Sequence, residues 1–411
     1  MDELIKELRE LEEMMLQCMK CGTCQSDCPL YRTDGRESSV ARGKISLLQS
    51  VYEGRIEDAG RILKHLDQCL LCTRCLKACP SGVKTDEIFL RGREVLRKIK
   101  KLPKWQKFIL KTAMEKPELM ARMAPLMHMG LKFGSKKVKD GIYRPLIPGL
   151  GGRNVVELKS EAFVKKYGGL NKADSEIMRV VFYPGCAVNL IYTEWGTAVV
   201  EVLRHFGVSV YVPETNICCG IPAASMGELE MYRNAVSANY NALAEYKDAA
   251  YIITCCPTCR YGLYEMGPKQ TGAECPLEVV DILVFLEEIL KVRLQSGAEG
   301  RSTVHFPCHY QDSKKVLVEN FVRNSTATEY IKLENQSCCG FAGTFSLKYY
   351  ERSKGFSRSK IQEMKDKKTV KVYSPCPGCA MQLADAAARE GLDAEVTHPV
   401  TELYDFLRKI K

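Results

Sequence analysis

Two cysteine runs with the same spacing limit what this chain can fold into. "CMKCGTCQSDCP" at 18–29 and "CLLCTRCLKACP" at 69–80 both read Cys-x-x-Cys-x-x-Cys-x-x-x-Cys-Pro. Three thiolates spaced in this way can hold three corners of one iron–sulfur cube. The fourth cysteine, placed before proline, ligates the other cluster in two-cluster ferredoxins. A chain that carries both runs must therefore bring them side by side.

This exchange of the fourth cysteine predicts two cubane [4Fe–4S] clusters. We expect Cys18, Cys21, Cys24 and Cys79 to hold the first, and Cys28, Cys69, Cys72 and Cys75 to hold the second. Gly22 suits the tight backbone between ligands, where N–H groups can bond to the sulfurs. The alternative is a structural zinc site within each run. Zinc sites rarely need four cysteines in eleven residues twice over, so we favour iron.

The cysteine total places the chain in a reducing compartment. Twenty cysteines occur in 411 residues, and the chain starts with the charged stretch "MDELIKELRELEEMM" in place of an apolar signal segment. No apolar run approaches the length of a transmembrane helix. In such a compartment clustered thiols bind metal more often than they pair. We therefore expect a cytoplasmic protein.

The C-terminal half contains an internal repeat of about 120 residues with a Cys-Cys-Gly triplet in each copy. β-Branched runs alternate with helical stretches, which predicts small parallel sheets whose strand ends carry the cysteines. The cysteines of the first copy are Cys186, Cys218, Cys219, Cys256 and Cys259, and those of the second are Cys308, Cys338, Cys339, Cys376 and Cys379.

Five thiols in a copy exceed the needs of zinc. A tetrahedral zinc ion takes four ligands, so a fifth thiol is idle or belongs to a larger iron–sulfur cluster. Zinc in one copy remains an alternative, because four of the five thiols would satisfy it. Cys255 and Cys275 occur in the first copy alone, and we interpret them as packing residues.

These patterns predict an α+β multidomain chain. We expect a helical di-cluster ferredoxin domain at 1–90, a basic Met-rich connector at 91–176, and α/β cysteine-rich modules at 177–300 and 301–411. The connector concentrates the charge, with 16 Lys and Arg against 4 Asp and Glu between Arg91 and Arg144. Such a segment is a solvated helix face, a docking surface for a partner subunit, or a peripheral contact with anionic lipids.

Several classes of function are disfavoured by missing motifs. We find no nucleic-acid-binding motif, so we expect no nucleic-acid partner. A flavin or nicotinamide fingerprint is also missing, which predicts that the chain holds no flavin and that an organic substrate is oxidised elsewhere.

The whole chain resembles the iron–sulfur subunits of flavin-linked dehydrogenases. "HLDQCLLCTRCLKACPSGV" is similar to the second cluster run of the glycolate oxidase subunit, and "YPGCAVN" and "NICCGIP" resemble the corresponding subunit of anaerobic glycerol-3-phosphate dehydrogenase. Lactate-oxidising subunits share the layout, and so does the catalytic subunit of heterodisulfide reductase. In that last family the five cysteines of a module bind a non-cubane [4Fe–4S] cluster that cleaves a disulfide.

The resemblance implies an electron-transfer subunit that accompanies an FAD-containing dehydrogenase. That partner would oxidise glycolate, lactate or glycerol 3-phosphate, and electrons would pass to a quinone or another carrier subunit at the inner face of the membrane. It also implies one or two non-cubane clusters in the modules. The alternative that it leaves open is a catalytic chain that reduces a disulfide at such a cluster.

Overall fold

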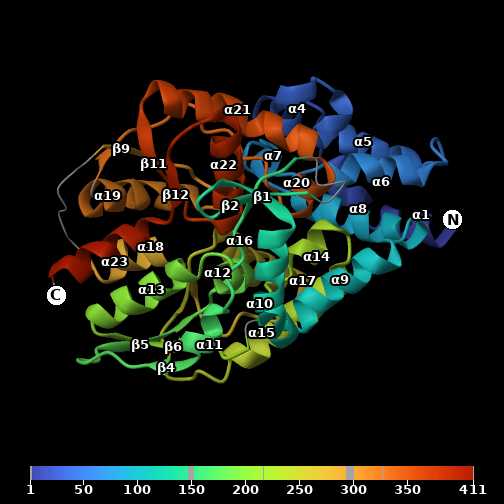
Figure 1. Cartoon of the computed structure of the whole chain (residues 1–411). Coiled ribbons are helices and arrows are strands. Elements are labelled where there is room, and N and C mark those ends of the chain that lie inside the picture. The colour runs from blue at the N-terminus through green and yellow to red at the C-terminus, as the bar shows by residue number, and fades with distance from the viewer. Residues whose placement is uncertain (1, 147–151, 216, 293–299, 327, 411) are drawn as a thin grey trace. The chain divides into compact units, whose positions relative to one another are not determined.

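The chain folds into two units that do not follow its sequence order. The computed structural model describes residues 2–146, 152–215, 217–292, 300–326 and 328–410 (Figure 1). Unit 1 comprises Met1–Leu110, Ile221–Tyr232 and Gly340–Phe356. Unit 2 comprises Lys111–Gly220, Arg233–Cys339 and Ser357–Lys411. Two of the segments in unit 1 therefore start at or just after the Cys-Cys pairs of the repeat.

Unit 1 is helical. Its helices are α1 (Asp2–Arg9), α2 (Glu12–Leu16), α3 (Thr23–Asp27), α4 (Pro29–Asp34), η1 (Glu37–Ser39), α5 (Ala41–Tyr52), α6 (Ala59–Asp67), α7 (Arg74–Lys77), α8 (Thr85–Ile99), the first part of α9 (Lys104–Glu115), α14 (Ile221–Ser225) and α20 (Thr344–Lys348), with the starts of α15 (Leu229–Leu243) and α21 (Tyr350–Asp366). Leu4, Leu8, Leu11 and Met15 recur at helical spacing and are buried. They pack with apolar residues of α5, α6 and α8 in one core.

Unit 2 contains three small sheets. A five-stranded sheet has the order β4-β6-β5-β7-β8 and a four-stranded sheet the order β10-β9-β11-β12. Their strands are β4 (Gly169–Asn171), β5 (Met178–Phe182), β6 (Val208–Val212), β7 (Ile252–Thr254), β8 (Val279–Asp281), β9 (Arg301–Val304), β10 (Glu329–Tyr330), β11 (Thr369–Tyr373) and β12 (Glu395–Thr397). The third sheet pairs β1 (Ser135–Lys139), β2 (Ile142–Pro145) and β3 (Val155–Val156) antiparallel.

The two larger sheets repeat one topology. Strands β6, β5, β7 and β8 pair parallel in that order, and β10, β9, β11 and β12 do the same. The prediction of small parallel sheets in both copies is therefore confirmed. Strand β4, which pairs antiparallel with β6, extends the first sheet at one edge.

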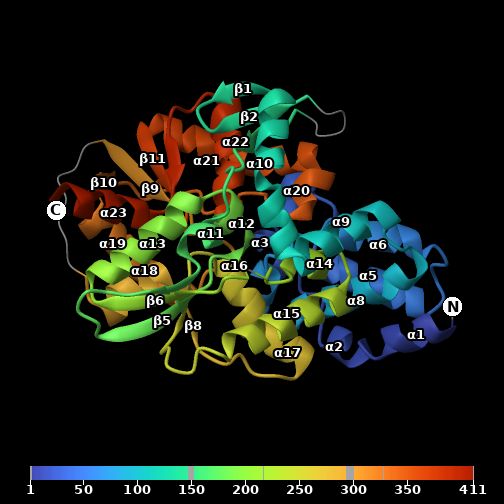
Figure 2. The ribbon, with the colours of Figure 1, turned by 60° about the horizontal axis from the view of Figure 1, so that its bottom comes forward.

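The helices of unit 2 exchange partners between the two copies. The last helix of the second copy, α23 (Pro399–Ile410), packs against the first long helix of the first copy, α13 (Thr193–His205), as Figure 2 shows. The reciprocal pair is α18 (Ile282–Val284) with α19 (Lys315–Ser325). One apolar core, which includes Trp195, Phe285 and Phe321, runs through both copies, so the two modules form one folding body.

The remaining helices of unit 2 connect these strands or follow the cysteines. They are α10 (Pro117–Phe133), α11 (Phe163–Tyr167), α12 (Gly185–Leu190), α16 (Pro257–Arg260), η2 (Tyr261–Met266), α17 (Gly267–Thr271), η3 (Phe285–Ile289), η4 (Asp312–Lys314) and α22 (Pro377–Glu390). Among the described residues no helix has the length and apolar character needed to cross a membrane.

Candidate metal centres

Two neighbouring cavities in unit 1 collect the eight ferredoxin-type cysteines. One is lined by Cys28, Cys69, Cys72 and Cys75. The other is lined by Cys18, Cys21, Cys24 and Cys79, with Cys75 between the two. The structure thus brings the fourth cysteine of each run to the cavity of the other run, which is the grouping expected for a two-cluster ferredoxin.

The backbone on both sides of each middle cysteine is left-handed. Lys20 and Gly22 flank Cys21 with φ of 55° and 89°, and Leu71 and Thr73 flank Cys72 with φ of 50° and 58°. A β-branched residue such as Thr73 rarely adopts positive φ, and each such residue costs on the order of 1 kcal/mol. Alternating backbone of this kind turns successive N–H groups to one side and forms an anion-binding hollow. The strain therefore fits a bound anionic cluster.

The half-buried thiols of Cys28 and Cys75 resist ionisation while no metal is bound. Burial and the neighbouring Cys69 raise the pKa of Cys75 to about 12. Burial also raises the pKa of Cys28, whereas the charge of Lys44 acts against that rise. Lys44 is itself buried, and its ammonium group donates to the carbonyl of Ser39. A cation among these sulfurs would offset the cost of several thiolates, so the donor set suits iron.

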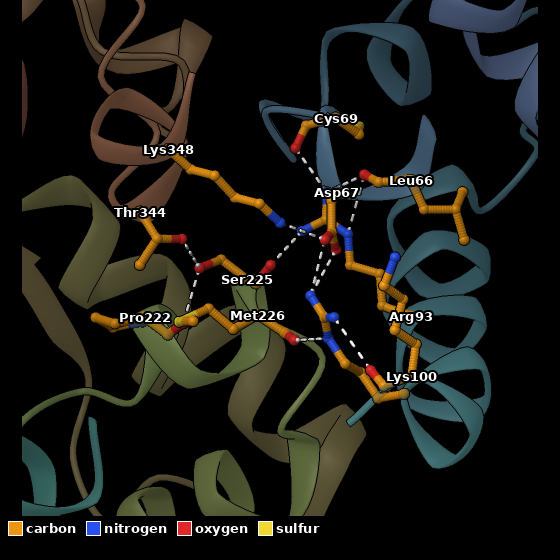
Figure 3. A network of polar contacts seen from close by, with 11 residues as sticks. Leu66, Asp67, Cys69, Arg93, Lys100, Pro222, Ser225, Met226, Thr344 and Lys348 are labelled. Atoms are coloured by element: carbon orange, nitrogen blue, oxygen red, sulfur yellow. Dashed lines mark hydrogen bonds and ion pairs between the residues drawn. The ribbon is translucent and has the colours of Figure 1, made fainter. Parts of the chain in front are cut away.

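A buried arginine fixes the loop that leads to Cys69. Figure 3 shows Arg93 of α8 donating to three carbonyl groups, those of Leu66, Cys69 and Ser225. The N···O distances are 3.1 Å to Leu66, 2.7 Å to Cys69 and 2.5 Å to Ser225. The guanidinium group therefore joins the backbone at a proposed ligand to the segment that follows the first Cys-Cys-Gly triplet.

A cluster of charged side chains lies around Asp67, close to Arg93 in unit 1. Arg97 donates to both carboxylate oxygens of Asp67 at 2.9 and 2.8 Å and to the carbonyl of Met226 at 2.8 Å. Lys348, from the segment that follows the second triplet, also contacts Asp67 at 2.9 Å (Figure 3). Both inserted segments of unit 1 are thus tied to the residues that precede Cys69.

In unit 2, the first copy gathers its five cysteines at the ends of parallel strands. Cys218, Cys219, Cys256 and Cys259 are buried, and Cys186 is exposed. Gly185, at φ +66°, leaves room for this set because a Cβ there would lie 2.9 Å from the sulfur of Cys259. The hollow beside Cys259 thus depends on a residue without a side chain.

The second copy repeats the arrangement. Cys338, Cys339, Cys376 and Cys379 are buried, and Cys308 is half-buried. The sulfurs of Cys339 and Cys379 lie 3.2 Å apart. Cys376 is the N-cap residue of α22, where the helix dipole favours a thiolate. In both copies, therefore, the first cysteine is the most accessible of the five.

The two thiol sets touch each other. The thiols of Cys256 and Cys376, which occupy equivalent positions in the two copies, lie close enough to shift each other's pKa, raising that of Cys256 and lowering that of Cys376. Thr258 reaches across as well, with its hydroxyl 3.9 Å from the sulfur of Cys376 and 3.4 Å from Nδ1 of His309. The ring of His309 stacks on Tyr261 at 4.4 Å. Ten cysteines thus form two adjoining sets of thiols.

Two functional candidates escaped the sequence analysis. His305 and Lys360 are fully buried beside the thiols of the second copy. A ring nitrogen of His305 lies within 4.8 Å of the sulfurs of Cys339 and Cys379. Its Nε2 is buried and has no hydrogen-bond partner among the described residues, which leaves one polar atom for a bound group. Alignment of the two copies would have drawn attention to His305, since Tyr183 stands in its place in the first.

The two cysteines interpreted as packing residues, Cys255 and Cys275, have no counterpart in the second copy. Cys255 is fully buried in the apolar core of unit 2, as the interpretation requires. Cys275 is half-buried. Burial raises the pKa of both thiols, which suits inert side chains.

Four sets of clustered thiols on a helical unit and a duplicated α/β unit define an iron–sulfur protein. Comparison with family models supports that class. A 4Fe-4S dicluster domain matches residues 14–83, and a cysteine-rich domain with the CCG signature matches 180–264 and again 302–384.

Two curated relatives match nearly the whole chain, and a third matches about half of it. The probable glycolate oxidase iron-sulfur subunit of Bacillus subtilis is 25% identical over 94% of this chain and 92% of its own length. A fumarate reductase (CoM/CoB) chain of Methanothermobacter marburgensis is 26% identical over 94% of this chain and 71% of its own. Lactate utilization protein A of Geobacillus kaustophilus is 30% identical over 54% of this chain and 96% of its own. The chain belongs to this family of iron–sulfur oxidoreductase subunits with dicluster and CCG domains.

Proposed function

We propose that this chain is the electron-transfer subunit of a flavin-linked dehydrogenase complex. Its partner would be an FAD-containing protein that oxidises a 2-hydroxy acid such as glycolate or lactate, or glycerol 3-phosphate. Relatives named as glycolate oxidase and lactate utilization proteins support the hydroxy acids. The dehydrogenation of such a substrate releases two electrons and needs an organic cofactor, for which this sequence shows no binding motif.

The observation that carries the proposal is the grouping of eighteen cysteines into four sets, two in each unit. We propose that Cys18, Cys21, Cys24 and Cys79 hold one cubane cluster and that Cys28, Cys69, Cys72 and Cys75 hold the other. The five thiols of each module would hold a further cluster. Iron–sulfur clusters, when bound, accept and release single electrons.

The residues around the thiols would prepare them for that role. Left-handed backbone at Leu71 and Thr73 directs N–H groups toward one side of the loop. Lys44 places a buried positive charge beside Cys28. The contact between Cys256 and Cys376 provides a short route between the two module sites.

Metal analysis of the anaerobically purified full chain, combined with EPR, tests the proposal. Four [4Fe–4S] clusters require about sixteen irons per chain. About eight irons with zinc would retain the ferredoxin assignment and contradict the assignment of module clusters. Material that is colourless and free of iron would contradict the whole proposal.

We also propose that the complex binds peripherally to the inner face of a membrane and delivers electrons to a quinone or a further carrier protein. Helix α9 exposes Trp105, Phe108 and Ile109, whose side chains are 63%, 70% and 58% accessible. Lys104 and Lys107 on the same helix are exposed too. Aromatic and basic side chains together favour anionic lipid surfaces.

Vesicle sedimentation tests this surface. The chain should sediment with vesicles that contain anionic phospholipid, and Trp105→Ser combined with Phe108→Ser should reduce the bound fraction several-fold. Equal sedimentation of the variant and the unaltered chain would assign the binding to another surface.

A second candidate function is the reduction of a disulfide at the modules. Both modules retain all five cysteines, and in each the first cysteine is the most accessible. The similarity to the fumarate reductase (CoM/CoB) chain also favours it. Turnover of a disulfide by the isolated chain with a chemical reductant, without any flavoprotein, would support this alternative and displace the first proposal.

A further inference from the structure

The two modules differ at one buried position beside their thiols. Tyr183 and His305 each stand three residues before the first cysteine of their module. In the first module the hydroxyl group of Tyr183 donates to the carbonyl of Ile217 at 2.5 Å. That carbonyl belongs to the residue directly before the Cys-Cys-Gly triplet.

In the second module a lysine donates to the equivalent carbonyl group. The ammonium group of Lys360 donates to the carbonyl of Ser337 at 2.5 Å, and Ser337 directly precedes the second triplet. The same ammonium group lies 2.8 Å from Nδ1 of His305. The offset of 120 residues between the triplets relates Lys360 to Tyr240, whose hydroxyl donates to the carbonyl of Leu263. A cation thus stands where the first module has neutral phenols.

The chemistry of the pair fixes the direction of its hydrogen bonds. An ammonium group only donates, so Nδ1 of His305 accepts from Lys360. The proton of the neutral imidazole then resides on Nε2. That atom is buried with no hydrogen-bond partner among the described residues, and a ring nitrogen of His305 lies within 4.8 Å of the sulfurs of Cys339 and Cys379. An N–H group that lacks a partner is therefore held close to the thiols.

Because Lys360 is buried, little solvent screens its positive charge from the neighbouring thiols. Lys360 and His305 are each 1% exposed. Burial lowers the pKa of Lys360 below its usual value, and the negative charge of nearby thiolates at Cys339, Cys338 and Cys379 acts against that fall. A buried ammonium group persists only beside such compensating charge. The positive charge and the thiolate sites therefore stabilise each other.

We propose that Lys360 and His305 act as a positioning pair that donates a hydrogen bond to Cys339 and raises the reduction potential of the cluster in the second module above that of the first. The inference rests on the proposed cluster ligation by the modules. Reduction adds negative charge, which a nearby cation and an N–H donor to a ligand sulfur both stabilise. Electrons that reach the modules would then collect at the second one, beside Cys308.

Redox titration of the full chain, followed by EPR under anaerobic conditions, tests this inference. Lys360→Gln keeps a donor for the carbonyl of Ser337 and removes the charge, and His305→Phe removes the N–H donor. Each should lower the potential of one cluster, so that its reduction equilibrium constant falls about ten-fold, equal to about 59 mV for one electron. Iron per chain should stay unchanged. Tyr183→Phe is the matched control in the first module. It should leave the reduction potential of the second-module cluster unchanged.

The possible outcomes separate the inference from the proposed function. An unchanged potential in both variants, with all iron retained, would overturn the inference and leave the proposed function standing. Loss of about four irons in His305→Phe alone would make His305 a ligand and would also overturn the donor role. Absence of module iron from the unaltered chain would refute the module assignment before any variant is compared.

Discussion

Replacement of Arg93 by methionine probes how unit 1 is held together. Arg93 is 1% exposed and donates to three carbonyl groups that come from two distant segments of the chain. Methionine fills a similar volume and has no donor. The variant therefore leaves the carbonyls of Leu66, Cys69 and Ser225 buried without this partner.

The magnitude follows from those three groups. A buried acceptor that loses its partner costs about 1–3 kcal/mol. The carbonyl of Leu66 keeps the N–H of Cys69 as a donor at 2.8 Å, so the carbonyls of Cys69 and Ser225 account for most of a loss of about 3 kcal/mol in the free energy of unfolding. In a domain with about the size of unit 1, each 1 kcal/mol lowers Tm by roughly 3–4 °C. We therefore expect Tm of unit 1 to fall by about 10 °C.

The assay is anaerobic thermal unfolding, followed by visible absorbance, in which an early phase of loss is assigned to the proposed ferredoxin clusters of unit 1 if Arg93→Met shifts that phase alone. Arg91→Met on the same helix is the matched control. Arg91 forms ion pairs with Glu94 and Glu10 near the surface and its side chain is 31% exposed. Surface pairs of this kind contribute at most about 1 kcal/mol, so this variant should unfold close to the unaltered protein.

A result in which both variants unfold within about 2 °C of the unaltered chain would refute the reasoning, since the expected shift is several times larger. It would mean that the three carbonyl groups find other partners at little cost. Early loss of absorbance in Arg93→Met without a change in the helical circular dichroism signal would instead locate the effect at the loop of Cys69 and spare the helical core.

Two further predictions concern unit 2. Burial raises the pKa of Asp281 in the folded chain to about 7. The folded state therefore binds the proton more tightly than the unfolded state does. The stability gained from this proton is complete below about pH 4 and is lost as the pH rises through about 7. Asp281→Asn should therefore raise Tm more at about pH 7.5 than at about pH 5, and an equal change at both would contradict the assigned pKa. Gly185→Ala places a methyl group 2.9 Å from the sulfur of Cys259 and should cost the chain about four irons, whereas Gly130→Ala on α10, with open space at its Cβ, should cost none. Unchanged iron in Gly185→Ala would show that the first module tolerates the methyl group.

Short-range patterns in the sequence predicted much of this fold. The strands before Cys186 and Cys308 were visible as β-branched runs, and both lie in parallel sheets. The cysteine spacing also predicted which thiols line each cavity of unit 1, because two-cluster ferredoxins exchange their fourth ligand. The division into four consecutive domains and the ligand sets themselves remain predictions.

What the sequence did not reveal depends on contacts between distant residues. Arg93 and Ser225 are separated by 132 positions, and Lys360 and His305 by 55. Each of these side chains is polar, so local pattern alone would place it at the surface. The left-handed backbone of Leu71 and Thr73 was equally hidden, since neither residue type favours it. These buried polar contacts and left-handed conformations are stabilised by the assembled fold, and they produce no periodic pattern in the sequence.

The composition of unit 1 from three separate stretches of chain has a consequence for biosynthesis. Ser225 and Lys348, which bond to Arg93 and Asp67, leave the ribosome long after the ferredoxin cysteines have emerged. The bonds from Arg93 to Ser225 and from Lys348 to Asp67 can therefore both be in place only after translation has passed residue 348, whereas the apolar core of the N-terminal region lies within residues 4–96. Messages truncated before that point would yield a cysteine-rich fragment that lacks one or both of these bonds.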